Sequence, residues 1–233
     1  MQTSRGTSPT CASAGAFGYA DPVRGLFITF EGAEGVGKTT QVARATAYLR
    51  ARGIEPLVTR EPGGTPLAEK LRSIVLEPGQ APVVAAAELL LMFAARASHV
   101  AEVIRPALEA GRCVLCDRFT DATEAYQGGG RGVEPEWIRA LAGIAHPGLL
   151  PALTIVFDAP ASVAHARLAS RGGRQDRIES EDAAFFERVR ATYLAIAARE
   201  PERVRVVDAT RPEGEVAASV AALLDTALAE CGR

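Results

Sequence analysis

The residues most suited to chemistry form a glycine-rich loop in the first fifth of the chain. Residues 32–39 read Gly-Ala-Glu-Gly-Val-Gly-Lys-Thr and match the pattern Gly-x-x-x-x-Gly-Lys-Ser/Thr. Glycines let the backbone curl until its N–H groups face a phosphate, Lys38 reaches the β- and γ-phosphates, and the Thr39 hydroxyl holds Mg²⁺. The pattern predicts an ATP·Mg²⁺ site formed by Gly32, Ala33, Glu34, Gly35, Val36, Gly37, Lys38, Thr39 and Thr40.

The segments around this loop are those that such a loop requires. The apolar run Leu26–Phe30 predicts a buried strand before it, and residues 40–52 predict a helix after it. The amino end of that helix adds its positive dipole to the anion site. Only two of the 26 basic residues are lysines, Lys38 and Lys70, so the loop keeps an ammonium in a chain that otherwise uses arginine. The alternative is a glycine-rich turn that binds nothing.

A carboxylate ends a second apolar strand. Asp117 comes directly after residues 113–116, which read Cys-Val-Leu-Cys. In a protein with a phosphate loop, a carboxylate at this place orients Mg²⁺ directly or through water. We predict that Thr39 and Asp117 bind the metal. The alternative is that Asp117 caps the next helix.

Arginines are dense in one glycine-containing segment. Arg171, Arg174 and Arg177 lie between two predicted helices, with Gly172 and Gly173 among them. Guanidinium groups neutralise charge on a phosphoryl group in transfer, and a closing segment excludes water. We predict that residues 171–182 form a lid; the alternative is a solvated surface loop.

Three more arginines, Arg60, Arg96 and Arg118, lie near predicted strand ends or on a long predicted helix. Convergent arginines hold phosphate monoesters well. Phe93 and Arg96 are three residues apart, so they share a helix face and could offer a ring and a donor to a nucleobase. An aromatic side chain at helical spacing is otherwise a core residue.

The order of elements predicts an α/β fold. Predicted strands at 26–30, 55–59, 113–116, 152–157 and 203–207 alternate with helices, including a long pattern over 82–110 that bends near Pro106 and helices separated by the glycines at 128–132. Such alternation favours a parallel sheet covered on both faces, with ligands at the carboxyl ends of the strands. Residues 1–24 are predicted to be a disordered extension or the product of an upstream start site, and residues 25–233 a single domain.

Composition excludes several classes of protein. A net charge of −2 gives no reason to expect nucleic-acid binding, and no apolar run is long enough to span a membrane. Cys113 and Cys116 have the spacing of half a zinc site, but no second pair accompanies them. We therefore expect both to be free cysteines that pack as small hydrophobic residues, which fits a reducing cytoplasm.

Taken together, these segments resemble bacterial thymidylate kinases over about residues 25–229. The matching stretches are Phe30–Thr40, Thr59–Thr65, Asp117–Arg131 and Asp176–Glu179, of which Arg-Glu-Pro-Gly-Gly and Ala-Tyr-Gln-Gly are the most specific. The resemblance implies a nucleoside-monophosphate kinase fold, a three-layer α/β/α sandwich with a parallel five-stranded sheet. It also implies a homodimer that phosphorylates dTMP to dTDP with ATP·Mg²⁺ in dTTP biosynthesis.

The resemblance further implies roles for individual residues. Arg118 would grip the 5′-phosphate, Arg60 and Pro62 would lie beside it, and Glu34 would approach the sugar 3′-hydroxyl. Tyr126 would disfavour a ribose, while the base would meet Arg96, Thr123, Gln127 and the ring of Phe93. Family members commonly place that ring four residues before the arginine, which is the position of Met92 here. The residues expected to act in catalysis are Lys38, Arg118, Arg171, Arg174 and Arg177.

One departure within the family bears on the lid. Some members, chiefly eukaryotic, carry a catalytic arginine inside the phosphate loop, whereas this loop has Gly35 and Val36 there. We therefore expect Arg171 or Arg174 to supply that charge. A kinase for dUMP, dCMP or AMP is the nearest alternative. A GTPase would require Asn-Lys-x-Asp, which the chain lacks, and a nucleic-acid-dependent ATPase would require a basic groove.

Overall fold

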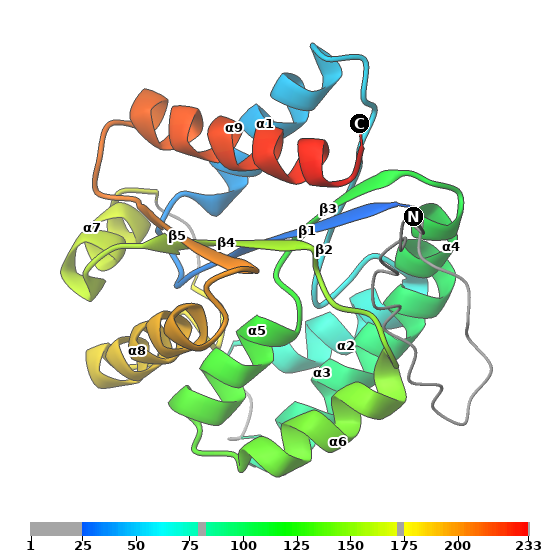
Figure 1. The fold of residues 1–233 in the computed structure, drawn as a ribbon. Coiled ribbons are helices and arrows are strands. Elements are labelled where there is room, and N and C mark those ends of the chain that lie inside the picture. The colour runs from blue at the N-terminus through cyan, green and yellow to red at the C-terminus, as the bar shows by residue number, and fades with distance from the viewer. Residues whose placement is uncertain (1–24, 79–82, 172–174, 233) are drawn as a thin grey trace, which may run out of the picture.

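A five-stranded sheet organises the molecule (Figure 1). The computed structural model describes residues 25–78, 83–171 and 175–232. All strand pairs in it are parallel. The order across the sheet is β2-β3-β1-β4-β5, for β1 (Leu26–Glu31), β2 (Leu57–Arg60), β3 (Cys113–Asp117), β4 (Leu153–Asp158) and β5 (Val204–Asp208).

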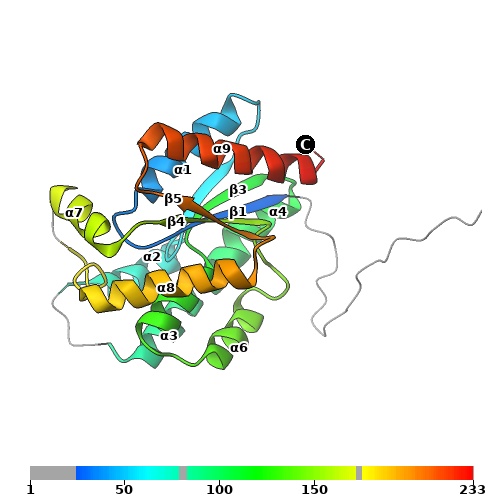
Figure 2. The ribbon, with the colours of Figure 1, turned by 60° about the vertical axis from the view of Figure 1, so that its left-hand side comes forward.

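Helices cover both faces of this sheet, as Figures 1 and 2 show. One face carries α1 (Lys38–Arg50) and α9 (Glu213–Glu230), and α7 (Ala161–Arg171) lies at the margin beside β5. The other face carries α2 (Pro66–Leu76), α3 (Ala85–His99), α4 (Arg105–Glu109), α5 (Thr120–Thr123), α6 (Pro135–Ala145) and α8 (Ala183–Arg199). The predicted three-layer α/β/α sandwich is confirmed.

Burial explains why the strands read as continuous apolar runs. All six residues of β1 are buried, because the strand lies in the middle of the sheet with helices on both sides. The edge strand β2 instead alternates between half-buried and exposed residues. Cys113 and Cys116 are buried within β3, as expected of small hydrophobic residues.

Helix α1 begins two residues earlier than the pattern predicts. Gly37 adopts a left-handed conformation with φ 92°, so the loop ends there and Lys38 and Thr39 already belong to the helix. The predicted helix over 82–110 forms as α3, a π-helical segment η1 (Val100–Ile104) and α4 in direct succession. The π-helical segment ends at Ile104, two residues before Pro106, whose ring removes a backbone donor.

The prediction that glycines 128–132 separate two helices is wrong for the first three of them. Gly128–Gly130 belong to a second π-helical segment, η2 (Glu124–Gly130), which continues α5. A Cβ at Gly129 would collide with Thr192 of α8, and one at Gly130 with the Phe185 ring of the same helix. The glycines therefore allow η2 and α8 to pack closely. Helix propensity alone predicts only that glycines interrupt a helix at these positions.

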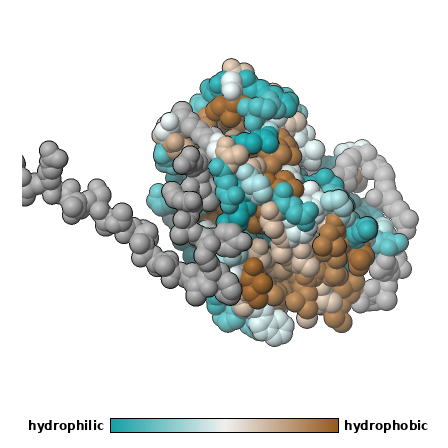
Figure 3. All heavy atoms as spheres, turned by 90° about the vertical axis from the view of Figure 1, so that its right-hand side faces the viewer, coloured by the Kyte–Doolittle hydropathy of each residue, from teal (hydrophilic) through white to brown (hydrophobic). Residues whose placement is uncertain are grey.

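The helices below the sheet leave an apolar surface uncovered. Five large side chains on three packed helices are about half exposed or more: Leu67 and Ile74 on α2, Leu90 on α3, and Trp137 and Ile144 on α6. Figure 3 shows hydrophobic side chains gathered in the lower part of this side of the molecule. We call these five residues the α2–α3–α6 face. Within the described ranges, no helix is both long and apolar enough to cross a bilayer.

Two glycine-to-alanine substitutions test the account of η2 packing. Gly130→Ala should lower the free energy of unfolding by about 2 kcal/mol, since the methyl group meets the buried Phe185 ring. Gly143→Ala in α6 is the matched control, because its Cβ would enter open space within a helix, and it should raise stability by about 0.5 kcal/mol. Urea denaturation measures both, and equal effects would contradict the packing argument.

Candidate active site

The carboxyl ends of three neighbouring strands open onto one cavity of about 480 Å³. From β1 comes the loop of residues 32–37, from β2 come Arg60 and Glu61, and from β3 come Asp117 and Arg118. Parallel strands end at the same edge, so residues from three distant segments meet there. Predicted site residues that line this cavity are Glu34, Gly35, Gly37, Lys38, Thr39, Thr40, Arg60, Pro62, Asp117, Arg118, Tyr126 and Gln127.

The phosphate loop has the backbone that its glycines suggest. Gly32, Gly35 and Gly37 all have positive φ angles, and a Cβ at Gly35 would collide with the Ala164 carbonyl of α7. Lys38 is buried, and its Nζ donates to the carbonyls of Gly32 (3.0 Å) and Ala33 (2.8 Å). Burial and the Arg118 charge lower the pKa of Lys38, and neighbouring carboxylates oppose that shift.

Arg118 is the centre of the polar side of the cavity. Its φ of 72° is the left-handed conformation that non-glycine residues rarely adopt. Its guanidinium donates to Glu34 Oε1 (2.6 Å), to the Tyr126 hydroxyl (2.9 Å) and to the Gly32 carbonyl (3.0 Å). Burial would raise the pKa of Glu34, but the Arg118 and Lys38 charges outweigh it and lower that pKa to about 2.

Two buried residues that the sequence analysis missed, Glu31 and Tyr193, support the position of Arg118. Glu31, at the end of β1, accepts hydrogen bonds from the Phe119 N–H (2.7 Å) and the Tyr193 hydroxyl (2.7 Å). The same hydroxyl lies 3.2 Å from Arg118 Nη1. Burial and the nearby Asp121 carboxylate raise the pKa of Glu31 to about 8. Tyr193 lies on α8, far along the chain, so no local motif marks it.

A third missed residue is Arg72 of α2, which lines the cavity beside Arg60. Arg72 Nη1 donates to the Pro62 carbonyl at 2.9 Å, and Arg60 is paired with Glu69 at 2.9 Å. Burial and the Arg60 charge lower the pKa of Arg72. Arg60, Arg72 and Arg118 thus place three guanidinium groups around one space. The Glu61–Pro62 peptide bond beside them is cis.

Arg96 is buried with 1% of its surface exposed, in a network that starts from Glu61. Its Nε lies 2.6 Å from Glu61 Oε2 and its Nη2 donates to the Phe119 carbonyl (3.0 Å), while Nη1 has no partner among the described residues. The other carboxylate oxygen of Glu61 meets His99 at 3.0 Å. Arg96 and His99 lower the pKa of Glu61 against the effect of burial.

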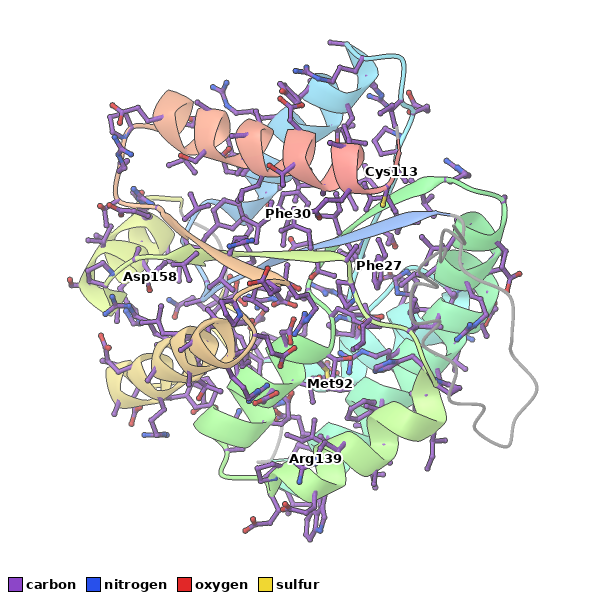
Figure 4. The ribbon with its side chains drawn as sticks, viewed as in Figure 1. Phe27, Phe30, Met92, Cys113, Arg139 and Asp158 are labelled. Atoms are coloured by element: carbon purple, nitrogen blue, oxygen red, sulfur yellow. The ribbon has the colours of Figure 1, made fainter. Side chains whose placement is uncertain are left out.

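The structure places Met92, and not Phe93, on the wall of the cavity. Phe93 is 3% exposed and packs in a separate cluster with Leu89, Val133 and Ile138. Figure 4 shows Met92 among the helices below the sheet. The prediction that Phe93 lies over a base is therefore wrong in register, because the helix turns the preceding residue towards the cavity.

Thr123 and Gln127 are both buried and lie four residues apart, and Gln127 lines the cavity. Gln127 Nε2 donates to Glu88 Oε1 at 2.7 Å, while Gln127 Oε1 and the Thr123 hydroxyl have no partner among the described residues. Buried polar atoms without partners are uncommon in folded proteins. Two of them four residues apart, one on a residue of the cavity wall, indicate a ligand with hydrogen-bonding groups of its own.

The predicted lid is only partly within the described residues. Arg174 lies outside them, as do residues 1–24, and α7 ends at Arg171. Arg177 does not reach the phosphate end of the cavity. Its Nη2 donates to Glu88 Oε2 (2.6 Å) and its Nε to the Val75 carbonyl (2.7 Å), so it joins this part of the predicted lid to α2 and α3.

Asp117 and Thr39 both line the cavity, and Asp117 Oδ1 is buried without a partner among the described residues. An orphaned carboxylate oxygen at the end of β3 fits a magnesium ion or one of its waters. The described residues contain no group of three acidic, His or Cys side chains that could hold a metal alone. Such an ion would need phosphate oxygens to complete its shell, as magnesium bound with a nucleotide does.

Comparison with known proteins agrees with this arrangement. The family model described as Thymidylate kinase matches residues 30–220. The chain belongs to the thymidylate kinase family. A thymidylate kinase from Pseudomonas savastanoi pv. phaseolicola is 55% identical over 200 residues, which cover 86% of this chain and 95% of that protein. One from Chromohalobacter salexigens is 54% identical over 206 residues, which cover 88% and 97% of the two chains.

The fold has a close counterpart among solved structures. The crystal structure of thymidylate kinase from Ehrlichia chaffeensis superimposes with a TM-score of 0.69 at 32% identity, covering 86% of this chain and 98% of that one. The match covers most of both chains, and this thymidylate kinase family member has the phosphate-loop nucleoside-monophosphate kinase fold that its sequence predicts.

The raised pKa of Glu31 gives a pH-dependent prediction. The folded protein binds this proton more tightly than the unfolded chain, so stability falls as pH rises from 4.5 through about 8. Glu31→Gln cannot titrate. Its amide oxygen can accept from the Phe119 N–H, and its NH₂ can donate to the Tyr193 hydroxyl oxygen in place of the bond that this hydroxyl donates to Glu31. Between about pH 6 and about pH 9, the stability of the variant relative to wild type should therefore rise by about 2 kcal/mol or more.

Urea denaturation of wild type and variant at both pH values measures this difference. Parallel pH dependence in the two proteins would show that the Glu31 carboxyl is not held in its protonated form.

Proposed function

We propose that this protein transfers the γ-phosphoryl group of ATP to dTMP and releases ADP and dTDP. The observation that carries the proposal is the cavity at the carboxyl edge of the sheet, which has two cationic ends. Lys38 and Thr39 of the phosphate loop form the donor end. Arg60, Arg72 and Arg118 form the acceptor end. A protein that only hydrolysed a nucleotide would have no use for the second set.

At the donor end, the loop N–H groups and Lys38 would bind the β- and γ-phosphates. Thr39 and Asp117 would hold Mg²⁺, with the orphaned Asp117 Oδ1 in support. When bound, the Mg²⁺ ion would neutralise negative charge on the triphosphate. Lys38 already has hydrogen bonds to two loop carbonyls, so its ammonium is oriented before a nucleotide arrives.

At the acceptor end, Arg118 would grip the dTMP phosphate, with Arg60 and the missed Arg72 beside it. A phosphate dianion takes paired N–H donors well, and a planar guanidinium offers them in a fixed geometry. Glu34, which holds Arg118 at 2.6 Å, would then lie close to the deoxyribose. Tyr126 shares the Arg118 contact and would leave no room for a ribose 2′-hydroxyl.

At the base end, Gln127 and Thr123 would meet the pyrimidine edge, supported by their unpartnered polar atoms. Arg96, whose Nη1 is also unpartnered, would donate to the base O4. Met92, on the cavity wall, takes the place proposed for an aromatic ring. Its thioether is a soft apolar surface suited to the face of a base.

The chemistry then needs positioning more than covalent help. The acceptor phosphate is already an anion and requires no strong base. Arg118 and Lys38 would bring an acceptor oxygen in line with the γ-phosphorus and offset charge on both groups. Because the phosphate loop has no arginine, we assign the remaining charge to Arg171 and Arg174 of the lid.

The α2–α3–α6 face supports a homodimer as part of this proposal. Its five half-exposed apolar side chains lie on three helices that pack together, and an apolar surface of this kind marks a protein contact. A second copy of the chain is the occupant that we propose. We propose a cytoplasmic location as well, which Cys113 and Cys116 support as free cysteines buried in a strand.

A substrate panel tests the proposed reaction. Release of ADP from ATP·Mg²⁺ is measured with dTMP, dUMP, dCMP and AMP as acceptors. We expect dTMP to be used fastest, with kcat/KM for dCMP and AMP lower by about a hundredfold or more, because their edges present the wrong hydrogen-bonding groups. Preference for another monophosphate would leave the phosphate loop in place and remove the base contacts named above.

A lid variant tests the source of the remaining charge. Arg174→Ala should lower kcat with dTMP by about a hundredfold and change KM by less than about threefold, because the lost contact forms in the transition state. Arg139→Ala is a matched control, since Arg139 is exposed on α6 and pairs with Glu136 there (Figure 4). A rise in KM with unchanged kcat would assign Arg174 to binding alone.

A further inference from the structure

Glu88 is a fully buried carboxylate that the proposed chemistry does not use. It lies in the first turn of α3 with 0% of its surface exposed. Its Oε1 accepts from Gln127 Nε2 at 2.7 Å, and its Oε2 lies 2.6 Å from Arg177 Nη2. Arg131 approaches the same carboxylate at 3.5 Å and also pairs with Glu181 at 2.7 Å. Glu88 therefore connects a cavity residue to two arginines beside it.

The chemistry of these groups fixes the orientation of the Gln127 amide. An arginine can only donate, so Arg177 and Arg131 keep the Glu88 oxygens as acceptors. A carboxylate that accepts from all its neighbours can face only the NH₂ side of an amide. Gln127 Oε1 is consequently turned away from Glu88, and it is the atom left buried without a partner among the described residues.

This orientation has a consequence for the ligand. Gln127 lines the cavity, and its one unused polar atom is an acceptor. A ligand atom that satisfies it must be a donor. Thymine and uracil carry a hydrogen on N3, whereas N3 of cytosine is an acceptor, and two facing acceptors repel and leave both without a bond.

We propose that Glu88 is a positioning residue that sets the base specificity of this enzyme. By holding the Gln127 amide with Oε1 free, Glu88 selects pyrimidines with an N3–H and disfavours cytosine. The inference rests on the proposed function, because it takes a nucleoside monophosphate as the ligand of the cavity. Glu88 acts only through Gln127 and contacts no substrate itself.

The Glu88→Gln variant tests this assignment. A glutamine at 88 has one acceptor, which the donor-only Arg177 requires, so its NH₂ faces Gln127. The Gln127 amide then turns Oε1 towards residue 88 and its own NH₂ towards the ligand. The ratio of kcat/KM for dTMP to that for dCMP should fall by about tenfold, the effect of one hydrogen bond. The ratio of their dissociation constants, measured by titration calorimetry without turnover, should fall in parallel.

If Glu88 had only a structural role, the variant would lower kcat/KM equally for dTMP and dCMP and leave their ratio unchanged. Glu181→Gln is the matched control, because it removes a carboxylate from Arg131 and leaves the Glu88–Gln127 hydrogen bond in place, and it should keep the wild-type ratio. In a Gln127→Leu background, Glu88→Gln should no longer change the ratio. If Glu88→Gln does not fold, Glu88→Asp, which withdraws the carboxylate from the amide by one methylene, is expected to lower the ratio as well.

The outcomes are distinct. A folded Glu88 variant with the wild-type ratio overturns the inference and leaves the proposed function standing. A wild-type protein that fails to phosphorylate or bind dTMP overturns both.

Discussion

Arg118 has a left-handed backbone at the end of β3, and the polar half of the cavity is arranged around its guanidinium. The conformation is costly for a residue with a Cβ, so the surrounding structure must hold it. Glu31 does so from β1 through the Phe119 N–H, and Tyr193 from α8 through its hydroxyl. Glu34 and Tyr126 then direct the side chain. One cation is thereby fixed by residues from four separate elements before any substrate binds.

Buried carboxylates also orient polar side chains at the other end of the cavity. Glu61 holds Arg96 and His99, and Glu88 holds Gln127 and Arg177, each carboxylate being almost fully buried. Burying a carboxylate is tolerable only when donors satisfy it, and one of these donors, Gln127, lines the cavity. The buried acids thus stabilise the fold and orient the groups that face a ligand.

Local motifs allowed much of this to be predicted. The phosphate loop, Asp117 and Arg118 are marked by short patterns at strand ends, and alternation of elements was enough for the sheet and its layers. Phe93 was misplaced because one residue of helical register depends on which side α3 turns to its neighbours. Glu31, Glu88 and Tyr193 were missed because their partners lie far along the chain, and Arg72 was missed because no motif marks it on α2. The glycines of η2 were misread because their reason is the surface of α8.

The loop lysine illustrates a further consequence of such prior arrangement. Lys38 Nζ is engaged by two carbonyl oxygens of its own loop. When a nucleotide binds, the Lys38 ammonium exchanges these neutral carbonyl partners for the anionic oxygens of the phosphates. The net gain in affinity from this lysine is the difference between two sets of contacts. In return, these two hydrogen bonds stabilise the shape of the loop, and an ammonium buried among carbonyls is less accessible to other anions than an exposed one.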